Sequence, residues 1–311
     1  MWPTILIAIY CLLVALASLA GGILPSKMRL SHTGMQVIMS FVGGLVLGVG
    51  LLHLLPHSFA ETGSLDQSVW AALAGLLTMF FLIRIFHVHQ HGPVEQAETC
   101  GHSLCDTSVD HEEHRHHDYP TDGDRCVAHQ HRYSWLGLGA GLTLHTLIDG
   151  MALAASVSAE AHDEATGLSL LGVGTFLAVV LHKPLDAMSI TTVMAAGGWS
   201  VRTRNLVNLG FALMCAIGAA GFYLGIQQFA EAQQAILGWA LGFAAGVFLC
   251  ISLGDILPEV QFHAHDKAKL SAALVLGIAL AYAIGFVEPA HQHGQPTAEP
   301  HEHEQHAEHE H

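Results

Sequence analysis

Eight apolar segments, each about twenty residues long or longer, dominate this 311-residue chain. A run of about twenty apolar residues is long enough for a helix to cross the hydrocarbon core of a bilayer. A helix also satisfies its backbone hydrogen bonds within its own segment, which lipid requires. The segments lie at residues 4–24, 34–56, 68–87, 134–158, 168–195, 204–226, 235–257 and 270–288. The sequence therefore predicts an all-α integral membrane protein with eight transmembrane helices in the lipid bilayer.

Composition agrees with this prediction and excludes other classes. Hydrophobic residues make up 51% of the chain and charged residues 12%, and the mean hydropathy is +0.43. The 11 Lys and Arg residues form no basic face, so we expect no nucleic-acid partner. Three of the six cysteines lie in apolar segments and three in a histidine-rich loop, a distribution that does not indicate disulfides. We also expect no organic cofactor.

The positive charges predict the orientation. Cytoplasmic connections of membrane proteins are enriched in Lys and Arg. With the N-terminus outside, ten of the eleven Lys and Arg residues lie in inner connections or at inner helix ends. The outer connections 57–67, 159–167 and 227–234 contain none, and the one exception is Lys183 within the fifth segment. We therefore predict that both termini are extracytosolic, and we expect a plasma (bacterial cytoplasmic) membrane.

Two polar regions separate or follow the spans. Residues 1–87 carry the first three spans and residues 134–288 the other five. Residues 88–133 are predicted to form a disordered cytosolic loop, and residues 289–311 an extracytosolic tail rich in His and Glu. The density of histidine around the loop predicts auxiliary metal binding, with a solvated linker as the alternative. The candidate ligands are His87, His89, His91, His111, His114, His116 and His117.

The second and seventh segments share a pattern. Residues 41–57 read FVGGLVLGVGLLHLLPH, and residues 243–259 read FAAGVFLCISLGDILPE. Because the two predicted helices run in opposite directions, the match indicates an inverted repeat of helices 1–3 and 6–8 around central helices 4 and 5. Chance similarity of two apolar helices that end in proline is the alternative. The repeat pairs four polar residues that we predict to line a pathway or its mouths: His53 with Asp255, and His57 with Glu259.

Polar residues also interrupt the fourth and fifth segments at matched spacing. His145 and Asp149 are four residues apart, as are His182 and Asp186, so each pair shares one helix face. Ionisable residues inside a membrane are rare and usually functional. Two imidazoles and two carboxylates form a ligand set that suits Zn²⁺ and accepts Fe²⁺, Mn²⁺ or Cd²⁺. The alternative is a hydrogen bond between packed helices, such as His145 with Asp186.

Together these features resemble the ZIP (Zrt/Irt-like) family of metal transporters. The resemblance is carried by HTLIDG (145–150), HKPLDA (182–187), LLHLLPHSFAE (51–61) and LGDILPE (253–259), with eight spans and a His-rich loop after the third. It implies influx of divalent metal ions into the cytosol, zinc above all, often by a homodimer. It implies a first metal position made by His145, Asp149, His182 and Asp186, with His53 beside the pathway.

The sequence departs from this family at a second metal position. The resemblance implies ligands directly after the two histidines and an acid on the sixth helix. Here those two residues are Thr146 and Lys183, and the sixth segment contains no Asp or Glu. Some branches of the family carry a Lys there. We hypothesise that the Lys183 ammonium replaces the second metal and leaves a single transport site.

Two other classes of function use intramembrane metal ligands. A metal-dependent enzyme is disfavoured, because the chain has no HExxH motif and no free carboxylate placed as a general base beside the His pairs. A membrane-anchored metal sensor or buffer is disfavoured by the repeat and by the polar pairs at mid-membrane depth. We therefore expect a transporter and not an enzyme.

Overall fold

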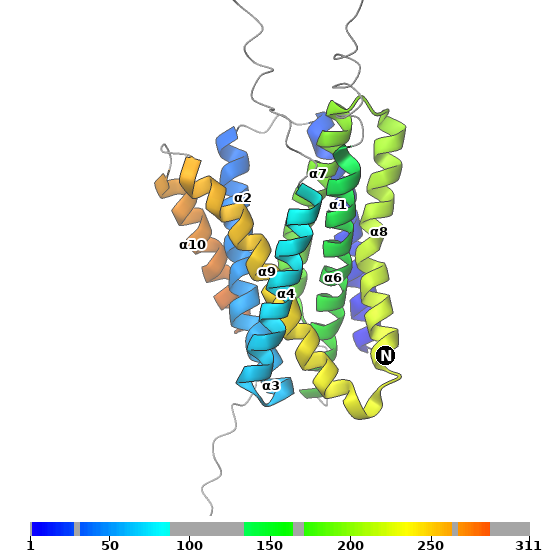
Figure 1. Cartoon of the computed structure of the whole chain (residues 1–311), viewed down its shortest axis with the longest axis vertical. Helices are drawn as coiled ribbons and strands as arrows, with labels where there is room; N and C mark the ends of the chain where they lie inside the picture. The colour runs from blue at the N-terminus through cyan, green and yellow to red at the C-terminus, as the bar shows by residue number, and fades with distance from the viewer. Residues whose placement is uncertain (1, 28–31, 88–133, 164–170, 263–266, 287–311) are drawn as a thin grey trace, which may run out of the picture.

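The computed structural model describes residues 2–27, 32–87, 134–163, 171–262 and 267–286. Among these residues, eight helices are long and apolar enough to cross a membrane, which confirms the predicted fold class. The helices run side by side between the two ends of an elongated bundle (Figure 1). The predicted loop and tail, with the candidate ligands from His89 to His117, lie outside the described residues.

The helix boundaries follow the apolar segments closely. The spans are α1 (Trp2–Lys27), α2 (His32–Val49) with the π-helix η1 (Gly50–Leu54) and α3 (Leu55–Thr62), α4 (Leu65–His87), α6 (Ser134–Asp163), α7 (Val173–Ala196), α8 (Val201–Ile226), α9 (Gln233–Phe262) and α10 (Lys267–Ile284). A 3-10 turn, η4 (Ala230–Ala232), leads into α9. Large apolar side chains such as Leu206 and Leu276 are exposed on the outside of the bundle, as expected where a helix faces lipid.

Several predicted helix ends are wrong. The fifth span was expected to begin at residue 168 but α7 begins at Val173, and the seventh was expected to end at residue 257 but α9 continues to Phe262. Two further errors lie at the end of the bundle where α3 and α6 finish. The second span was expected to end at Pro56, but α3 continues to Thr62 and ends at Gly63, whose φ is 63°. Pro56 has no N–H to donate, and the π-helix η1 ends at Leu54, just before α3, so the helix changes its hydrogen-bonding pattern without ending. The fourth span was expected to end at residue 158, but α6 reaches Asp163. Parts of the predicted connections 57–67 and 159–167 are therefore helical.

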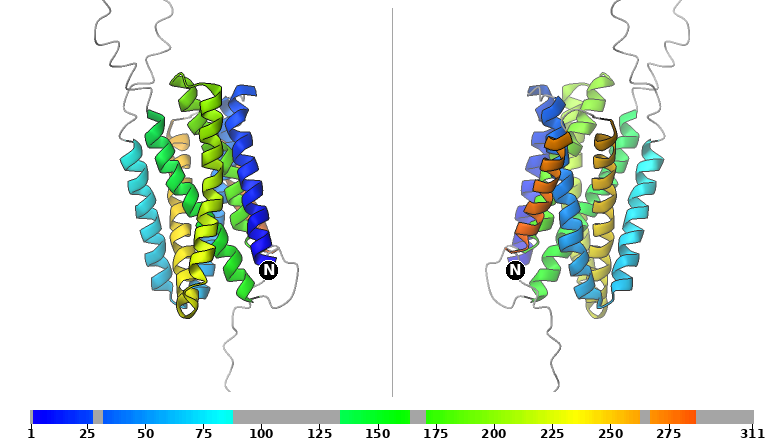
Figure 2. Two further views of the ribbon diagram at one scale, coloured as in Figure 1. Left: turned by 90° about the vertical axis from the view of Figure 1, so that its right-hand side faces the viewer. Right: turned by 90° about the vertical axis from the view of Figure 1, so that its left-hand side faces the viewer.

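The helices pack in matched pairs. Helix α2 packs against α10 and α4 against α9, while α1 packs against α7 and α6 against α8. These pairs can be followed from two further sides in Figure 2. Exchanging the first three spans with the last three, and α6 with α7, converts each pair into its counterpart, as an internal two-fold arrangement requires. The pairing does not show that the two halves superpose, so the inverted repeat stays a prediction.

Glycines allow the closest of these contacts. Gly44 of α2 lies against the backbone carbonyl of Leu274 in α10. Gly246, its predicted counterpart in α9, lies against the backbone carbonyl of Ala72 in α4. A Cβ atom at either position would overlap the neighbouring backbone, so only glycine fits. The two halves therefore bring their helices together at matching positions.

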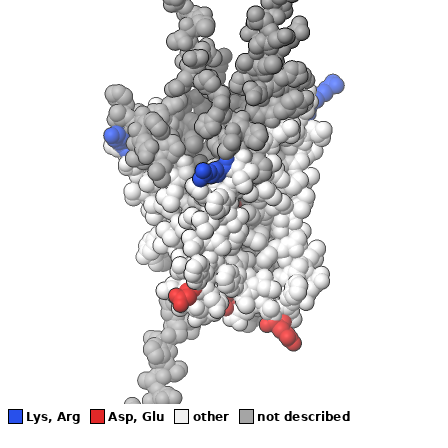
Figure 3. All heavy atoms as spheres, in the orientation of Figure 1, with Lys and Arg blue, Asp and Glu red and all other residues white. Residues whose placement is uncertain are grey.

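Charged side chains divide between the two ends of the bundle (Figure 3). The basic end is where α4 finishes and where α8 and α10 begin; it carries Arg84, Arg202, Arg204, Lys267 and Lys269. The opposite end, where α1 begins, carries the acidic residues Glu61, Asp66 and Glu231. The described part of the chain thus has a basic end and an acidic end.

Candidate metal centre

Helices α6 and α7 bring the two His/Asp pairs together. One ligand atom from each of His145, Asp149, His182 and Asp186 lies within 4.8 Å of the other three. The two residues of each pair lie one turn apart on the same helix, and α6 packs against α7. We refer to these four residues as the central cluster. The structure brings together the residues that the sequence singled out, and their ligation of a metal stays a prediction.

The separations within the central cluster have the size of a metal coordination shell. His145 Nε2 lies 3.2 Å from Asp149 Oδ2 and 3.6 Å from Asp186 Oδ2. His182 Nε2 lies 3.3 Å and 3.8 Å from the same two oxygens. Ligand atoms about 2.1 Å from a tetrahedral zinc ion lie about 3.4 Å from one another. A small cation could therefore be held by all four side chains once the Lys183 ammonium, which contacts the same two carboxylate oxygens, moves aside.

The His182 ring is oriented by its own helix. Its Nδ1 lies 2.7 Å from the Ala178 carbonyl oxygen and donates a hydrogen bond to it. Its Nε2 lies 3.3 Å from Asp149 Oδ2, within hydrogen-bonding distance, and a metal ion bound at Nε2 would replace the proton of that contact. Backbone fixing of this kind is how metal-binding imidazoles are commonly held.

Several buried atoms of the central cluster lack hydrogen-bond partners. Both ring nitrogens of His145 and the Oδ1 atom of Asp149 have none. His145 is 1% exposed and Asp149 is completely buried, so bulk solvent does not reach these atoms. Buried polar groups are almost always paired, and the exceptions call for an explanation such as an ion. These unpaired atoms fit the donor set of a divalent cation.

Lys183 contacts both carboxylates of the cluster. Its Nζ lies 2.5 Å from Asp149 Oδ2 and 2.8 Å from Asp186 Oδ2, and it donates a hydrogen bond to Thr146 Oγ1 at 3.1 Å. The side chain is 1% exposed and its ammonium also lies 5.6 Å from the centre of the Phe211 ring. Two buried carboxylates without a nearby positive charge would be strongly unfavourable. Lys183 therefore supplies the charge that keeps the cluster stable without a metal.

His53 and His57 are not among the four residues that meet in the central cluster. His53 Nε2 is 2.7 Å from the Ala281 carbonyl oxygen, so this ring lies at the contact between η1 and α10. His57 is buried in α3, near the acidic end of the bundle. Asp255 and Glu259 belong to α9, but their side chains are outside the described part of the structure, as is the side chain of His87. The pathway role of these residues stays a prediction.

Glu160 is the buried acid that sequence reasoning missed. It was counted in an outer connection, but it lies in the last turns of α6 and is 2% exposed. Its Oε2 accepts a hydrogen bond from the Gly172 N–H at 2.9 Å, and its Oε1 lies 3.8 Å from His57 Nδ1. The sequence did contain a signal for Glu160. It follows Asp149 by eleven residues, which is about three helical turns, so a helix that continues this far places both acids on the same face.

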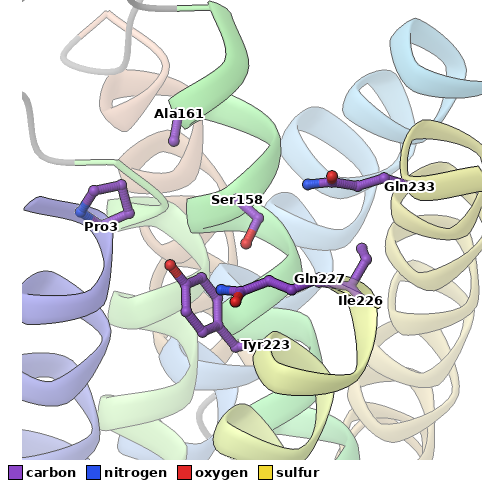
Figure 4. A pocket seen from close by; sticks show the side chains of 7 residues that line it. All are labelled: Pro3, Ser158, Ala161, Tyr223, Ile226, Gln227 and Gln233. Carbon is purple, nitrogen blue, oxygen red and sulfur yellow. The ribbon is translucent and has the colours of Figure 1, made fainter. Parts of the chain in front are cut away.

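A cavity of about 130 Å³ opens at the acidic end, between α1, α6, α8 and α9 (Figure 4). It is lined by Pro3, Ser158, Ala161, Tyr223, Ile226, Gln227 and Gln233. These neutral side chains include no residue of the central cluster. The Tyr223 hydroxyl that borders the cavity is hydrogen-bonded to Thr4 Oγ1 at 3.0 Å. The cavity therefore offers no charged ligand for a cation.

Comparison with known proteins points to one family. The sequence pattern of the family described as ZIP Zinc transporter matches residues 3–285. The chain is 27% identical over 271 residues to Zinc transporter ZIP4 of Homo sapiens, covering 74% of this chain and 39% of that protein. It is 22% identical over 290 residues to Zinc transporter 3 of Arabidopsis thaliana, covering 89% of this chain and 80% of that protein. It spans about two fifths of the length of its human and rat ZIP4 relatives.

Proposed function

Because the chain belongs to the ZIP zinc transporter family, we propose that it carries zinc across a membrane through the central cluster. The observation that supports this most is the meeting of four potential ligands, two of them with unpaired buried atoms, inside an eight-span bundle. Zinc is the metal in the names of its relatives, and mixed imidazole and carboxylate ligands suit it. Fe²⁺, Mn²⁺ and Cd²⁺ are further candidate substrates with the same ligand preferences.

We propose that transport runs toward the cytosol, from the acidic end to the basic end. The positive-inside rule assigns the basic end to the cytosol, so α1 begins outside. The outer half of the α6–α7 contact is closed by a hydrogen bond of 2.7 Å between Ser156 and Thr175. Of the four side chains in the cluster, Asp186 is the most exposed, at 17%, and it lies one turn further toward the inner end than His182. Access from inside, with the outer route closed, is one state that alternating transport requires.

We propose a single metal position in the central cluster. The Lys183 ammonium lies between the two carboxylates and contacts Thr146, the other residue at the expected second position. A second divalent ion there would meet the positive charge of this ammonium at close range. Two cluster-bound metals per chain would contradict this proposal.

The remaining features also stay proposals. The family's link to homodimers and the expected plasma-membrane location rest on the resemblance and on composition. The mass of the purified protein in detergent would test the first, and fractionation of the native membranes the second. Metal binding by the loop histidines can be tested by comparing the full chain with a variant that lacks residues 88–133.

Uptake of zinc into proteoliposomes tests the proposed function. We expect saturable uptake by the purified protein and at least a tenfold loss in His182→Ala, because removal of one ligand weakens a metal site by about this much or more. Ser189→Ala is the matched control, since Ser189 is exposed on the same helix. Excess Fe²⁺, Mn²⁺ or Cd²⁺ in the same assay ranks the substrates. A folded protein that moves none of these ions would favour a sensor, a buffer or an enzyme instead.

A further inference from the structure

We propose that Cys11 and Cys215 form a binding site for a soft divalent cation such as Hg²⁺, separate from the central cluster. The two residues face each other across the contact of α1 with α8, and a side-chain hydrogen bond joins their sulfur atoms. Neither takes part in a disulfide, and both are buried, at 8% and 0% exposure. We refer to these two residues as the thiol pair. The proposed transport of zinc gives them no role, so this inference does not depend on it.

The packing of α1 on α8 holds the thiol pair in place. The two helices run in opposite directions, and a contact on either side of the pair follows the same register. Toward the acidic end, Thr4 Oγ1 lies 3.0 Å from the Tyr223 hydroxyl. Toward the basic end, Asn208 Nδ2 donates a hydrogen bond to the Leu19 carbonyl oxygen at 3.3 Å. Successive contacts are seven or eight residues apart on each helix, which is about two turns, so all three lie on one face of α1 and one face of α8. The packing of the two helices as a whole therefore brings the sulfurs together.

The surroundings of the thiol pair decide which metal it suits. Cys215 belongs to the same buried apolar cluster as Val14 and Ala152, and Cys11 to the same one as Leu153. Zinc takes four ligands from protein and water, so two sulfurs inside an apolar contact do not satisfy it. A soft ion of the Hg²⁺ type needs only two sulfurs on opposite sides. The thiol pair therefore selects a soft ion, whereas the imidazoles and carboxylates of the central cluster suit a borderline one.

Charge balance favours a divalent ion at the thiol pair. Two S–H bonds break, two metal–sulfur bonds form, and two protons leave as one divalent cation enters, so the net charge of the site stays zero. Cys11 lies about 14 Å along α1 from Trp2, inside the hydrocarbon core, where an unbalanced charge is costly. Metal–sulfur bonds of about 2.3 Å on opposite sides of an ion place the sulfurs about 4.6 Å apart. Sulfurs that are already in hydrogen-bonding contact reach this separation by a small outward movement.

Simple packing is the competing explanation, because a buried cysteine behaves as a small apolar residue. Cys11→Ser and Cys215→Ser separate the two explanations, since each keeps the size of the side chain but leaves one thiol. An ion held by two sulfurs of one protein gains from the high effective concentration of the second sulfur, and either substitution removes this gain. Cys11→Ala and Cys215→Ala add no hydroxyl to the apolar contact and should bind as weakly as the serine variants. The unfolding temperature of each metal-free variant shows that it is folded.

The experiment is Hg²⁺ binding to the purified protein in detergent, with excess imidazole and a small monothiol as competitors. So that only the thiol pair remains, serine replaces the four other cysteines in the parent protein: Cys100, Cys105, Cys126 and Cys250. We expect one Hg²⁺ per chain, two sulfur neighbours in its X-ray absorption spectrum, and a higher unfolding temperature because the ion ties α1 to α8. Cys11→Ser and Cys215→Ser should each weaken binding at least tenfold. His182→Ala is the control and should bind Hg²⁺ as the parent does.

Three results would overturn the inference. Equal binding of Hg²⁺ by the parent and by either serine variant would mean that one thiol is sufficient. Loss of binding in His182→Ala, or nitrogen and oxygen neighbours around the ion, would place Hg²⁺ in the central cluster instead. A parent protein that retains no Hg²⁺ would reduce the thiol pair to a packing contact. None of these measurements requires zinc transport, so failure of this inference and failure of the proposed function are distinguishable.

Discussion

Lys183 is the residue that most limits how a metal ion enters the central cluster. Its ammonium contacts the Oδ2 atoms of Asp149 and Asp186, and these are the same oxygens that face the two imidazoles. A bound metal and the ammonium therefore compete for the same oxygens. We expect the lysine side chain to withdraw toward Thr146 when the metal binds, because Thr146 Oγ1 already accepts one of its hydrogen bonds.

Replacing Lys183 by methionine tests this competition. Lys183→Met keeps the length of the side chain but leaves two buried carboxylates without a counter-charge. Removing one partner of a buried ion pair costs about 3–5 kcal/mol. The metal-free variant should therefore unfold at a lower temperature than the wild type, and added zinc should raise its unfolding temperature more than it raises that of the wild type. Thermal unfolding with zinc and with a chelator measures both effects.

Equal stability of the two metal-free proteins would mean that Lys183 does not balance the cluster. The control is Lys269→Met. Lys269 is exposed at the basic end, so this substitution removes the same charge far from the cluster. This variant should behave like the wild type with and without zinc.

At this scale the sequence predicted part of the site. The spacing of His145 with Asp149, and of His182 with Asp186, was sufficient to predict two ligand pairs, because helical geometry fixes which residues share a face. The position of the Lys183 ammonium was not predictable in the same way. Its contact with Asp149 crosses from α7 to α6 and depends on how the two helices pack, which periodicity does not reveal.

Among the elements, the number of spans was easier to predict than their ends. Bilayer thickness sets a minimum length for each apolar run, so eight runs gave eight helices. The final turns of α3 and α6 contain polar residues such as His57 and Glu160, which hydropathy places outside the membrane. Packing against neighbouring helices buries these residues, so both helices continue past the apolar segment. This is also why Glu160 escaped notice.

The glycine contacts between elements give a stability prediction. Gly246→Ala places a Cβ atom against the backbone of Ala72, so α4 and α9 must separate. We expect a loss of about 1–3 kcal/mol, typical of overpacking. Gly44→Ala should cause a similar loss at the contact of α2 with α10, because its Cβ atom would meet Leu274. Thermal unfolding in one detergent measures both variants.

Gly221→Ala is the matched control, since no atom lies within 4 Å of a Cβ at this position of α8. It should be neutral or slightly stabilising, by at most about 1 kcal/mol, because alanine favours the helix more than glycine does. If neither Gly44→Ala nor Gly246→Ala lowered the unfolding temperature, the helices would not approach each other as closely at these two positions as the structure shows.

For the molecule as a whole, the division of charge makes the topology testable. We expect a single cysteine at Glu231 to react with a membrane-impermeant maleimide in intact cells, and one at Arg202 to react only after the membrane is opened. The background needs all six native cysteines replaced, because the reagent reacts with any accessible thiol. The opposite labelling pattern would reverse the orientation and, with it, the proposed direction of transport.

The central claim is that one metal ion binds the four residues of the cluster, and anomalous diffraction at the zinc edge tests it most directly. In crystals of the zinc-loaded protein, the account predicts one peak in the cluster, about 2.0–2.2 Å from an imidazole nitrogen of His145 and of His182 and from a carboxylate oxygen of Asp149 and of Asp186. The peak should be absent in His182→Ala. Two peaks in the cluster, or zinc bound elsewhere with none there, would contradict the account.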